Sequence, residues 1–288
     1  MFLSVVIPAY NEERRLPKTL ARVVEYLGGR GDGGEIVVVN DGSRDRTAEV
    51  ARAFAGAHAA SPGGSRVAVT VLENPSNCGK GYSVRHGMLQ AQGEWLLFSD
   101  ADLSSPIEEC DKLLAAAQSG GCDVAIGSRA LDRSLIGVHQ SPFRENAGRI
   151  FNACMRLATG LPFHDTQCGF KLFRRAAAQQ IFGRQRLERF GFDVELLYLA
   201  RKLGFRAVEV PVRWDHSEGT KVSMLGDSVD MFFDLWRVRR NDWKGLYDHP
   251  AAPAGEAGRP AASRAQPHPG EPAPIKPHVA GRASPPKS

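Results

Sequence analysis

Short apolar runs alternate with longer amphipathic stretches along the first part of the chain. The apolar runs predict strands, at residues 2–7, 36–39, 67–72 and 95–98. The stretches between them repeat apolar residues at helical spacing and predict helices, around residues 20–27, 47–57 and 82–91. Strands that alternate with helices in this way are typical of βαβ units. We therefore predict an α/β fold with an open, mostly parallel sheet and helices on both faces.

Each predicted strand is followed by a polar segment. These segments are PAYNEE (8–13), NDGSRDRT (40–47), NPSNCGKGYSVR (74–85) and SDADLS (99–104). In open α/β sheets, ligands bind in the crevice beyond the carboxyl ends of the strands. We therefore predict that a functional site lies where these segments meet.

The segment SDADLS contains two carboxylates, Asp100 and Asp102, directly after an apolar strand. Side chains two residues apart in an extended segment point the same way, so the pair would attract a hard cation. Mg²⁺ or Mn²⁺ fits this setting, because such ions take one or two carboxylates and complete their coordination with substrate phosphates and water. The alternative is that the pair caps a helix that starts near Pro106.

The segments after the second and third strands carry weaker signals. Asp41 could accept hydrogen bonds from a base or a ribose, although an ordinary strand-to-helix turn would look similar. Lys80 lies between Gly79 and Gly81, whose backbone permits a close approach, and its charge can balance a phosphate. The spacing differs from that of a P-loop and of a dinucleotide-binding GxGxxG, so neither an ATPase nor a dehydrogenase is indicated.

Composition limits the picture further. A chain of 288 residues with 42% hydrophobic residues can bury one substantial core. Residues 251–288 hold nine of the 18 prolines and no aromatic residue, and their five basic and two acidic side chains supply +3 of the net charge of +5. We predict a disordered tail there, and the lack of a dense basic cluster argues against nucleic acid as a partner. The five cysteines lack metal-ligand spacing and are expected to be reduced thiols.

The segment LGDSVDMFFDLWRVRRNDW, residues 225–243, predicts an amphipathic helix with several arginines. Its apolar face either packs against the rest of the chain or rests on a membrane surface, and an integral membrane partner is a further alternative. No run approaches the roughly 18 apolar residues of a membrane-spanning helix. We therefore expect a cytoplasmic protein that is peripheral on the cytoplasmic membrane face. Its expected parts are residues 1–223, the helix at 224–247 and the tail at 248–288.

Taken in order, PAYNEE, NDGSRDRT, NCGKG and the DAD of residues 100–102 resemble the motifs of glycosyltransferase family 2, whose members have the GT-A fold. Motifs in the second half narrow the resemblance; they are GSR (127–129), RENAGRIFN (144–152), DTQCGFK (165–171), FGFDVELL (190–197) and EGTKVS (218–223). These look like the dolichyl-phosphate β-glucosyltransferases, and the polyprenyl-phosphate mannose synthases are the nearest alternative. The resemblance covers residues 1–223 and implies that they form a GT-A catalytic domain.

The resemblance implies roles for individual residues. The nucleotide sugar would be held by Pro8, Ala9, Tyr10, Glu12, Asp41, Lys80, Asp100 and Ala101, and the divalent metal by Asp100 and Asp102. Arg129 and Lys221 match basic positions near the donor and acceptor phosphates, and Asp165 matches an aspartate beside the acceptor. A related pattern has a glutamine two positions after the second aspartate, whereas this chain has Ser104.

The resemblance implies an inverting transfer of a hexose, glucose from UDP-glucose, to a polyprenyl or dolichyl phosphate. A phosphate monoester is already ionised at neutral pH, with a second pKa of about 6, so it can attack without a general base. One alternative is a GDP-mannose-dependent mannosyltransferase. Another is a family 2 enzyme that acts on a sugar hydroxyl and needs Asp165 as its base. A third is a nucleotide-sugar-binding module without catalysis.

Overall fold

The structure is a computed structural model that describes residues 3–61, 66–138, 156, 159–189, 191–215 and 226–251. Several predictions fall outside these ranges and keep the status of predictions. They concern Lys221, the motifs at 144–152 and 218–223, and the tail beyond residue 251.

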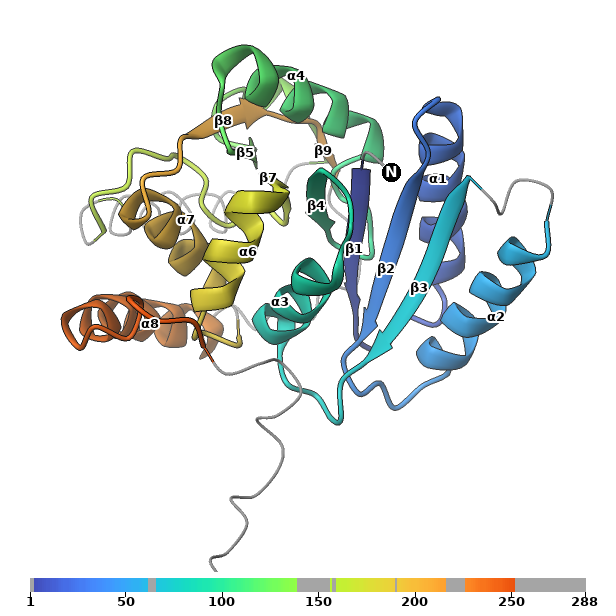
Figure 1. Ribbon diagram of the computed structural model, residues 1–288, viewed down its shortest axis with the longest axis horizontal. Helices are drawn as coiled ribbons and strands as arrows, with labels where there is room; N and C mark the ends of the chain where they lie inside the picture. Colours follow the sequence, from blue (N-terminus) through green and yellow to red (C-terminus); the bar gives the residue numbers. More distant parts are fainter. Residues whose placement is uncertain are drawn as a thin grey trace, which may run out of the picture.

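A seven-stranded sheet runs through the described part of the chain in the order β3-β2-β1-β4-β7-β5-β8 (Figure 1). Its strands are β1 (Leu3–Ala9), β2 (Gly34–Asn40), β3 (Val67–Glu73), β4 (Trp95–Ser99), β5 (Val124–Ser128), β7 (Phe170–Arg174) and β8 (Ala207–Pro211). Only β7 is antiparallel to its neighbours in this sheet, β4 and β5, and the other pairs are parallel. A small second sheet pairs β6 (Ile136–Val138) with β9 (Trp214–Asp215). The predicted open, mostly parallel sheet is confirmed.

Helices cover both faces of the sheet, as the alternating pattern predicts. The helices are α1 (Leu16–Gly29), α2 (Thr47–Ala59), α3 (Lys80–Gln90), α4 (Cys110–Gly120), α6 (Arg175–Arg184), α7 (Phe192–Lys202) and α8 (Gly226–Trp243), with short 3₁₀ turns η1 (Ile107–Glu109) and η2 (Arg133–Leu135). One buried cluster joins α3, α6, α7 and α8 to the sheet, and the other joins α1, α2 and α4 to its opposite face. Strands in such a sheet are covered on both sides, which explains why their apolar runs are continuous.

Alternate side chains of one strand enter the two clusters. In β1, Val6 belongs to the cluster with α3, whereas Val5 and Ile7 belong to the cluster with α1. In β4, Leu96 and Leu97 divide in the same way. This two-sided burial fixes the register of the strands, because a slip of one residue would exchange the two faces. The carboxyl ends of β1, β2 and β4 are thereby held side by side.

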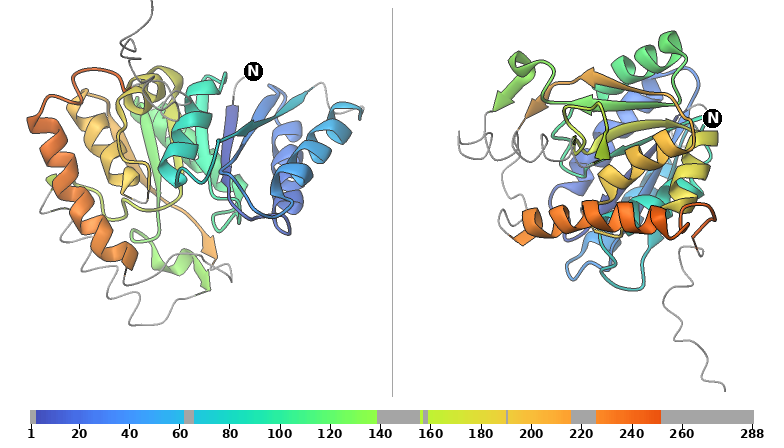
Figure 2. Two further views of the ribbon diagram at one scale, coloured as in Figure 1. Left: turned by 90° about the horizontal axis from the view of Figure 1, so that it is seen from below. Right: turned by 90° about the vertical axis from the view of Figure 1, so that its left-hand side faces the viewer.

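The C-terminal helix α8 lies along α7 at one side of the molecule (Figure 2). Leu235 and Val238 face inward and are buried, and Tyr247 in the following turn is fully buried. Phe233, Trp236 and Trp243 point outward instead, so these three aromatic residues are not on the face that packs. Among the described residues, no helix is long and apolar enough to cross a membrane.

Candidate functional site

The loops that follow β1 and β2 are joined by hydrogen bonds at the carboxyl edge of the sheet. The backbone N–H of Asn11 donates to Ser43 Oγ at 3.0 Å, and the backbone N–H of Arg44 donates to Asn11 Oδ1 at 2.8 Å. The backbone N–H of Glu12 donates to Thr47 Oγ1 at 2.7 Å. Asn11 has a positive φ of 54°, a conformation that asparagine tolerates better than most residues. These hydrogen bonds fix the first loop, which contains the predicted nucleotide-binding residues. Pro8, Tyr10 and Glu12 are partly exposed, and Ala9 is buried.

Asp41 organises the loop that leads into α3. Its carboxylate accepts hydrogen bonds from the backbone N–H groups of Cys78 and Gly79, at 2.9 and 3.0 Å, and from Asn74 Nδ2 at 2.8 Å. The side chain is almost completely buried. These contacts give Asp41 a structural role beside the site, and its direct contact with a nucleotide remains a prediction.

The glycines on either side of Lys80 allow the backbone of residues 187–189 to pack against them. A methyl group at Gly79 would come within 2.4 Å of the carbonyl oxygen of Glu188, and Gly79 has a φ of +103°. A methyl group at Gly81 would come within 2.7 Å of the carbonyl oxygen of Leu187. Helix α3 begins at Lys80, two residues before the predicted start, so the lysine stands in its first turn. This packing fixes the backbone of the first turn of α3, from which the Lys80 side chain extends.

Lys80 and Asp100 form an ion pair across the site, with 2.6 Å between Lys80 Nζ and Asp100 Oδ1. Burial alone would lower the pKa of Lys80, but the carboxylates around it, Asp100 first among them, raise it above its ordinary value. Lys80 is therefore a fixed positive charge at neutral pH. Asp100 follows β4 directly, so the pair lies at the carboxyl edge of the sheet.

The aspartate loop after β4 is held in place by close contacts. Thr19 Oγ1 of α1 donates to the carbonyl oxygen of Ala101 at 2.6 Å, and the backbone N–H of Ser104 donates to Asp102 Oδ1 at 3.0 Å. Gly169 leaves room for Asp100, because a methyl group there would lie 2.2 Å from Asp100 Oδ2. Asp100 and the backbone of Ala101 thus lie against residues distant in the sequence, whereas Asp102 is held by its neighbour Ser104.

A buried ion pair lies behind Asp100. Lys171 of β7 is completely buried and its Nζ lies 2.5 Å from Asp193 Oδ1, in the first turn of α7. The same ammonium donates to the carbonyl oxygen of Cys168 at 2.6 Å and lies 5.2 Å from the ring centroid of Phe98. Burial raises the pKa of Asp193, although the charge of Lys171 opposes that rise. The pair helps to hold β7 against α7 beneath the site.

Arg129 and Asp165 form a two-pronged ion pair. Arg129 Nε donates to Asp165 Oδ2 at 2.7 Å, a terminal guanidinium nitrogen donates to Oδ1 at 2.9 Å, and the backbone N–H of Arg129 adds a bond of 3.0 Å. Asp165 is only 1% exposed. Burial would raise the pKa of this carboxyl, but Arg129 outweighs burial and holds it below its ordinary value. A carboxylate stabilised in this way is a weak proton acceptor, and its main action is to orient Arg129.

The charges in this region leave a negative excess. The cations Lys80, Arg129 and Lys171 face four carboxylates, which are Asp100, Asp102, Asp165 and Asp193. Asp102 has no ion-pair partner within the described ranges. No group of three or more His, Cys, Asp or Glu side chains suited to a metal occurs in the described part of the chain. Two partly exposed carboxylates without a closed cage fit a hard dication that shares its coordination with substrate phosphates.

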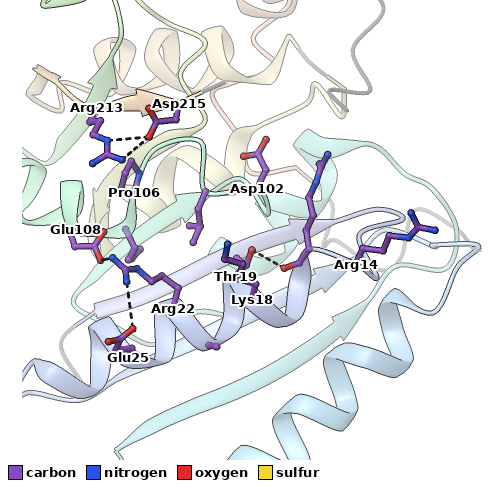
Figure 3. Close-up of a pocket in the computed structure, with 14 residues that line it drawn as sticks. Arg14, Lys18, Thr19, Arg22, Glu25, Asp102, Pro106, Glu108, Arg213 and Asp215 are labelled. Atoms are coloured by element: carbon purple, nitrogen blue, oxygen red, sulfur yellow. Dashed lines mark hydrogen bonds and ion pairs between the residues drawn. The ribbon is translucent and has the colours of Figure 1, made fainter. Parts of the chain in front are cut away.

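A cleft of about 790 Å³ opens beside the aspartate loop, between α1 and the segment before η1 (Figure 3). Asp102 stands on one wall, while Lys18 and Arg22 line another and Arg213 lies on a third side. Arg22 pairs with Glu108 at 2.7 Å, and Arg213 pairs with Asp215 at 2.9 Å. The cleft therefore gives the second aspartate access to an open, charged surface.

Gly169, Lys171 and Asp193 were not assigned to the site from the sequence. Lys171 interrupts the apolar strand FKLF, and a lysine in such a strand is a signal of a buried partner. Gly169 has no comparable signal, because its importance lies in the space that Asp100 occupies. The predicted residues Lys80, Asp100 and Asp102 do come together, as do Arg129 and Asp165.

Comparison with known proteins gives consistent results. A family model described as "Glycosyl transferase family 2" matches residues 4–182. The dolichyl-phosphate beta-glucosyltransferase of Drosophila melanogaster is 40% identical over 247 residues, which cover 82% of this chain and 74% of that protein. The human protein of the same name is 35% identical, with 82% and 74% covered.

A similar fold is found in solved structures. One is glucosyl-3-phosphoglycerate synthase from Mycobacterium tuberculosis in complex with Mn²⁺, UDP-glucose and phosphoglyceric acid. It aligns with a TM-score of 0.56 and 18% identity, and the alignment covers 87% of this chain and 81% of that one. At this identity the likeness concerns the fold.

Proposed function

The chain belongs to glycosyl transferase family 2, and we propose that it transfers glucose from UDP-glucose to dolichyl phosphate or another polyprenyl phosphate. The observation that carries the choice of substrates is the match to proteins named dolichyl-phosphate beta-glucosyltransferase over 82% of the chain. The ion-paired residues at the carboxyl edge of the sheet support the chemistry, because they combine fixed cations with two accessible carboxylates.

Asp100 and Asp102 would hold Mg²⁺ or Mn²⁺, with the donor diphosphate completing the coordination. When bound, such an ion neutralises phosphate charge and stabilises the diphosphate as it leaves. Lys80 supplies a second positive charge. Its ammonium group lies 2.6 Å from Asp100 and would therefore be close to the bound ion and the diphosphate. The nucleotide would lie against the loops that follow β1, β2 and β4. These loops contain Pro8, Ala9, Tyr10, Glu12, Asp41 and Ala101.

The acceptor would react without a general base. Its phosphate oxygen attacks C1 of the glucose, a C1–O bond forms, and the bond from C1 to the diphosphate breaks as UDP departs. A single displacement inverts the anomeric centre, so an α-linked donor gives a β-linked product. Arg129 would attract the acceptor phosphate, and Asp165 would keep the guanidinium in position. Lys221 is proposed to join it, although it lies outside the described residues.

The acceptor suggests where the protein works. A polyprenyl phosphate has its hydrocarbon chain in a bilayer and its phosphate at the surface. We propose that the protein reaches this phosphate from the cytoplasmic face, either by binding the membrane surface or through an integral membrane partner. The nucleotide sugar would come from the cytoplasm.

Incubation with labelled donors tests the proposal. The purified chain would be mixed with Mg²⁺ and polyprenyl phosphate, and with either radiolabelled UDP-glucose or radiolabelled GDP-mannose. Organic extraction then separates lipid-linked sugar from unreacted donor. We expect extractable label from UDP-glucose only, and an Asp100→Asn variant serves as the inactive control. Label from GDP-mannose alone would replace the proposed donor, and label from neither would reject transfer to this acceptor.

A further inference from the structure

Exposed large apolar side chains are concentrated on one helix. Five such side chains occur in the described part of the chain, and four of them belong to α8 or the turn after it. Phe233 and Trp236 are each 57% exposed, Trp243 is 83% exposed and Leu246 is 40% exposed; the fifth is Leu131. Scattered apolar side chains are normal on a protein surface, but a cluster with two tryptophans marks an interaction site.

The helix that presents this cluster is firmly attached through its other face. Leu235 and Val238 are buried against the domain, and Lys202 of α7 forms ion pairs with Asp242 and Asp248, the latter at 3.0 Å. Tyr198 adds a hydrogen bond of 2.5 Å from its hydroxyl group to Asp242 Oδ2. The outward face is therefore a fixed surface, and it is not needed to hold α8 in place.

Basic side chains alternate with the aromatic ones on the outward face. Arg237, Arg240 and Lys244 are exposed, and the Arg240 guanidinium lies 5.3 Å from the ring centroid of Trp236. Among the described acidic side chains of this stretch, Asp234 is buried and pairs with Arg237 at 2.7 Å, and Asp242 and Asp248 pair with Lys202. The outward face thus combines tryptophan with the positive charges of Arg240 and Lys244.

We propose that the outward face of α8, which contains Phe233, Trp236, Arg240 and Trp243, binds the surface of an anionic lipid bilayer. Tryptophan side chains are favoured at the level of lipid headgroups, and arginine and lysine pair with anionic headgroup phosphates. Residues 252–288 are a poor match for this face, because they contain no aromatic residue and only Ile275 and Val279 as large aliphatic ones. The proposal rests on the proposed function in one respect, which is that the acceptor lies in a bilayer.

A short series of hydrogen bonds connects the turn after α8 to the transfer site, the site that contains Lys80 and Asp100. Tyr247 donates a hydrogen bond to Glu195 Oε1 at 2.7 Å, and Glu195 Oε2 accepts one from the backbone N–H of Leu187 at 2.8 Å. The backbone carbonyl oxygen of the next residue, Glu188, accepts a hydrogen bond of 3.1 Å from the backbone N–H of Tyr82, two residues after Lys80. Membrane binding through α8 would therefore hold the transfer site at a set position relative to the bilayer.

Vesicle sedimentation tests the proposal. The full chain would be mixed with vesicles of phosphatidylcholine alone or with phosphatidylglycerol added, both free of polyprenyl phosphate. We expect binding to the anionic vesicles and a loss of at least about tenfold in the triple variant Phe233→Ser, Trp236→Ser, Trp243→Ser. Leu131→Ser is the matched control, because it removes an exposed leucine that does not belong to α8, and it should bind like the parent.

Three results would overturn the proposal: no binding of the parent to anionic vesicles, equal binding of the triple variant, or binding only when membrane proteins are present. If the triple variant does not fold, Trp243→Ser alone replaces it, since this side chain is the most exposed of the set. Transfer to a short-chain, water-soluble polyprenyl phosphate is measured in parallel. If the parent binds vesicles without transferring sugar, only the proposed function fails, whereas transfer by a parent that ignores vesicles rejects only the docking surface.

Discussion

Gly169 is expected to be essential for the position of Asp100. A methyl group at Gly169 would lie 2.2 Å from Asp100 Oδ2 and 2.6 Å from its Cγ. The backbone of Gly169 does not have a positive φ, so alanine is compatible with its conformation. The variant Gly169→Ala therefore tests a steric contact with the carboxylate, without backbone strain.

The size of the effect follows from this geometry. Carbon and oxygen atoms that are not bonded stay more than 3 Å apart, so the carboxylate must move by about 1 Å. This shift would disturb the 2.6 Å contact between Asp100 and Lys80 and the alignment of Asp100 with Asp102. A misplacement of about 1 Å in a reacting site can lower the rate by about 100-fold. We expect a loss of this size in kcat/KM, together with a weaker apparent affinity for Mn²⁺.

Steady-state transfer with UDP-glucose at several Mn²⁺ concentrations measures both quantities, and a thermal melt shows whether the fold survives. Gly183→Ala is the matched control, because a methyl group at this position in α6 meets nothing within 4 Å. The control should keep full activity and gain up to about 1 kcal/mol of stability from the better helix former. Parental kcat/KM and parental Mn²⁺ dependence in Gly169→Ala would refute the steric argument.

Three further variants test neighbouring parts of the account. Lys80→Ala removes the ammonium group paired with Asp100 and should lower kcat by about 100-fold, with little change in melting temperature. An unchanged kcat would show that this charge does not act on the diphosphate. Asp165→Asn leaves the Arg129 guanidinium without its buried partner and should lower the free energy of unfolding in urea by about 3 kcal/mol, whereas unchanged stability would contradict the proposed positioning role. Burial raises the pKa of Glu195 to about 7, so its contribution to stability is present below pH 4.5 and is lost as the pH rises to about 7. In Glu195→Gln, the free energy of unfolding in urea should fall less between pH 5 and pH 8 than it does in the parent. An equal fall in both proteins would contradict this role of Glu195.

The fold could be predicted from the sequence because its signals are local. The apolar runs fall within strands β1, β2, β3 and β4, apart from Phe2, which precedes the described residues. The polar segments after these strands predicted the edge at which Lys80, Asp100 and Asp102 meet. A strand that must be buried on both faces leaves little freedom in placement, which is why this level of prediction succeeds.

The side-chain partners could not be predicted in the same way. Arg129 and Asp165 are 36 residues apart, and Lys171 and Asp193 are 22 apart, so only the folded chain shows that they pair. The pairing changes the interpretation of Asp165, from a candidate base to a carboxylate that orients Arg129. Helical spacing likewise groups Phe233 and Trp236 on one face, but spacing alone does not say whether that face packs or is exposed.

The most direct test of the central claim is the binding of UDP, measured by calorimetry with Mn²⁺ or with a chelator. The claim is that Asp100 and Asp102 together hold a divalent ion that binds the donor diphosphate. The account predicts that the parent binds UDP tightly with Mn²⁺ and much more weakly with chelator, and that the double variant Asp100→Asn, Asp102→Asn loses this difference. Equal, chelator-insensitive binding by the parent and the double variant would contradict the account.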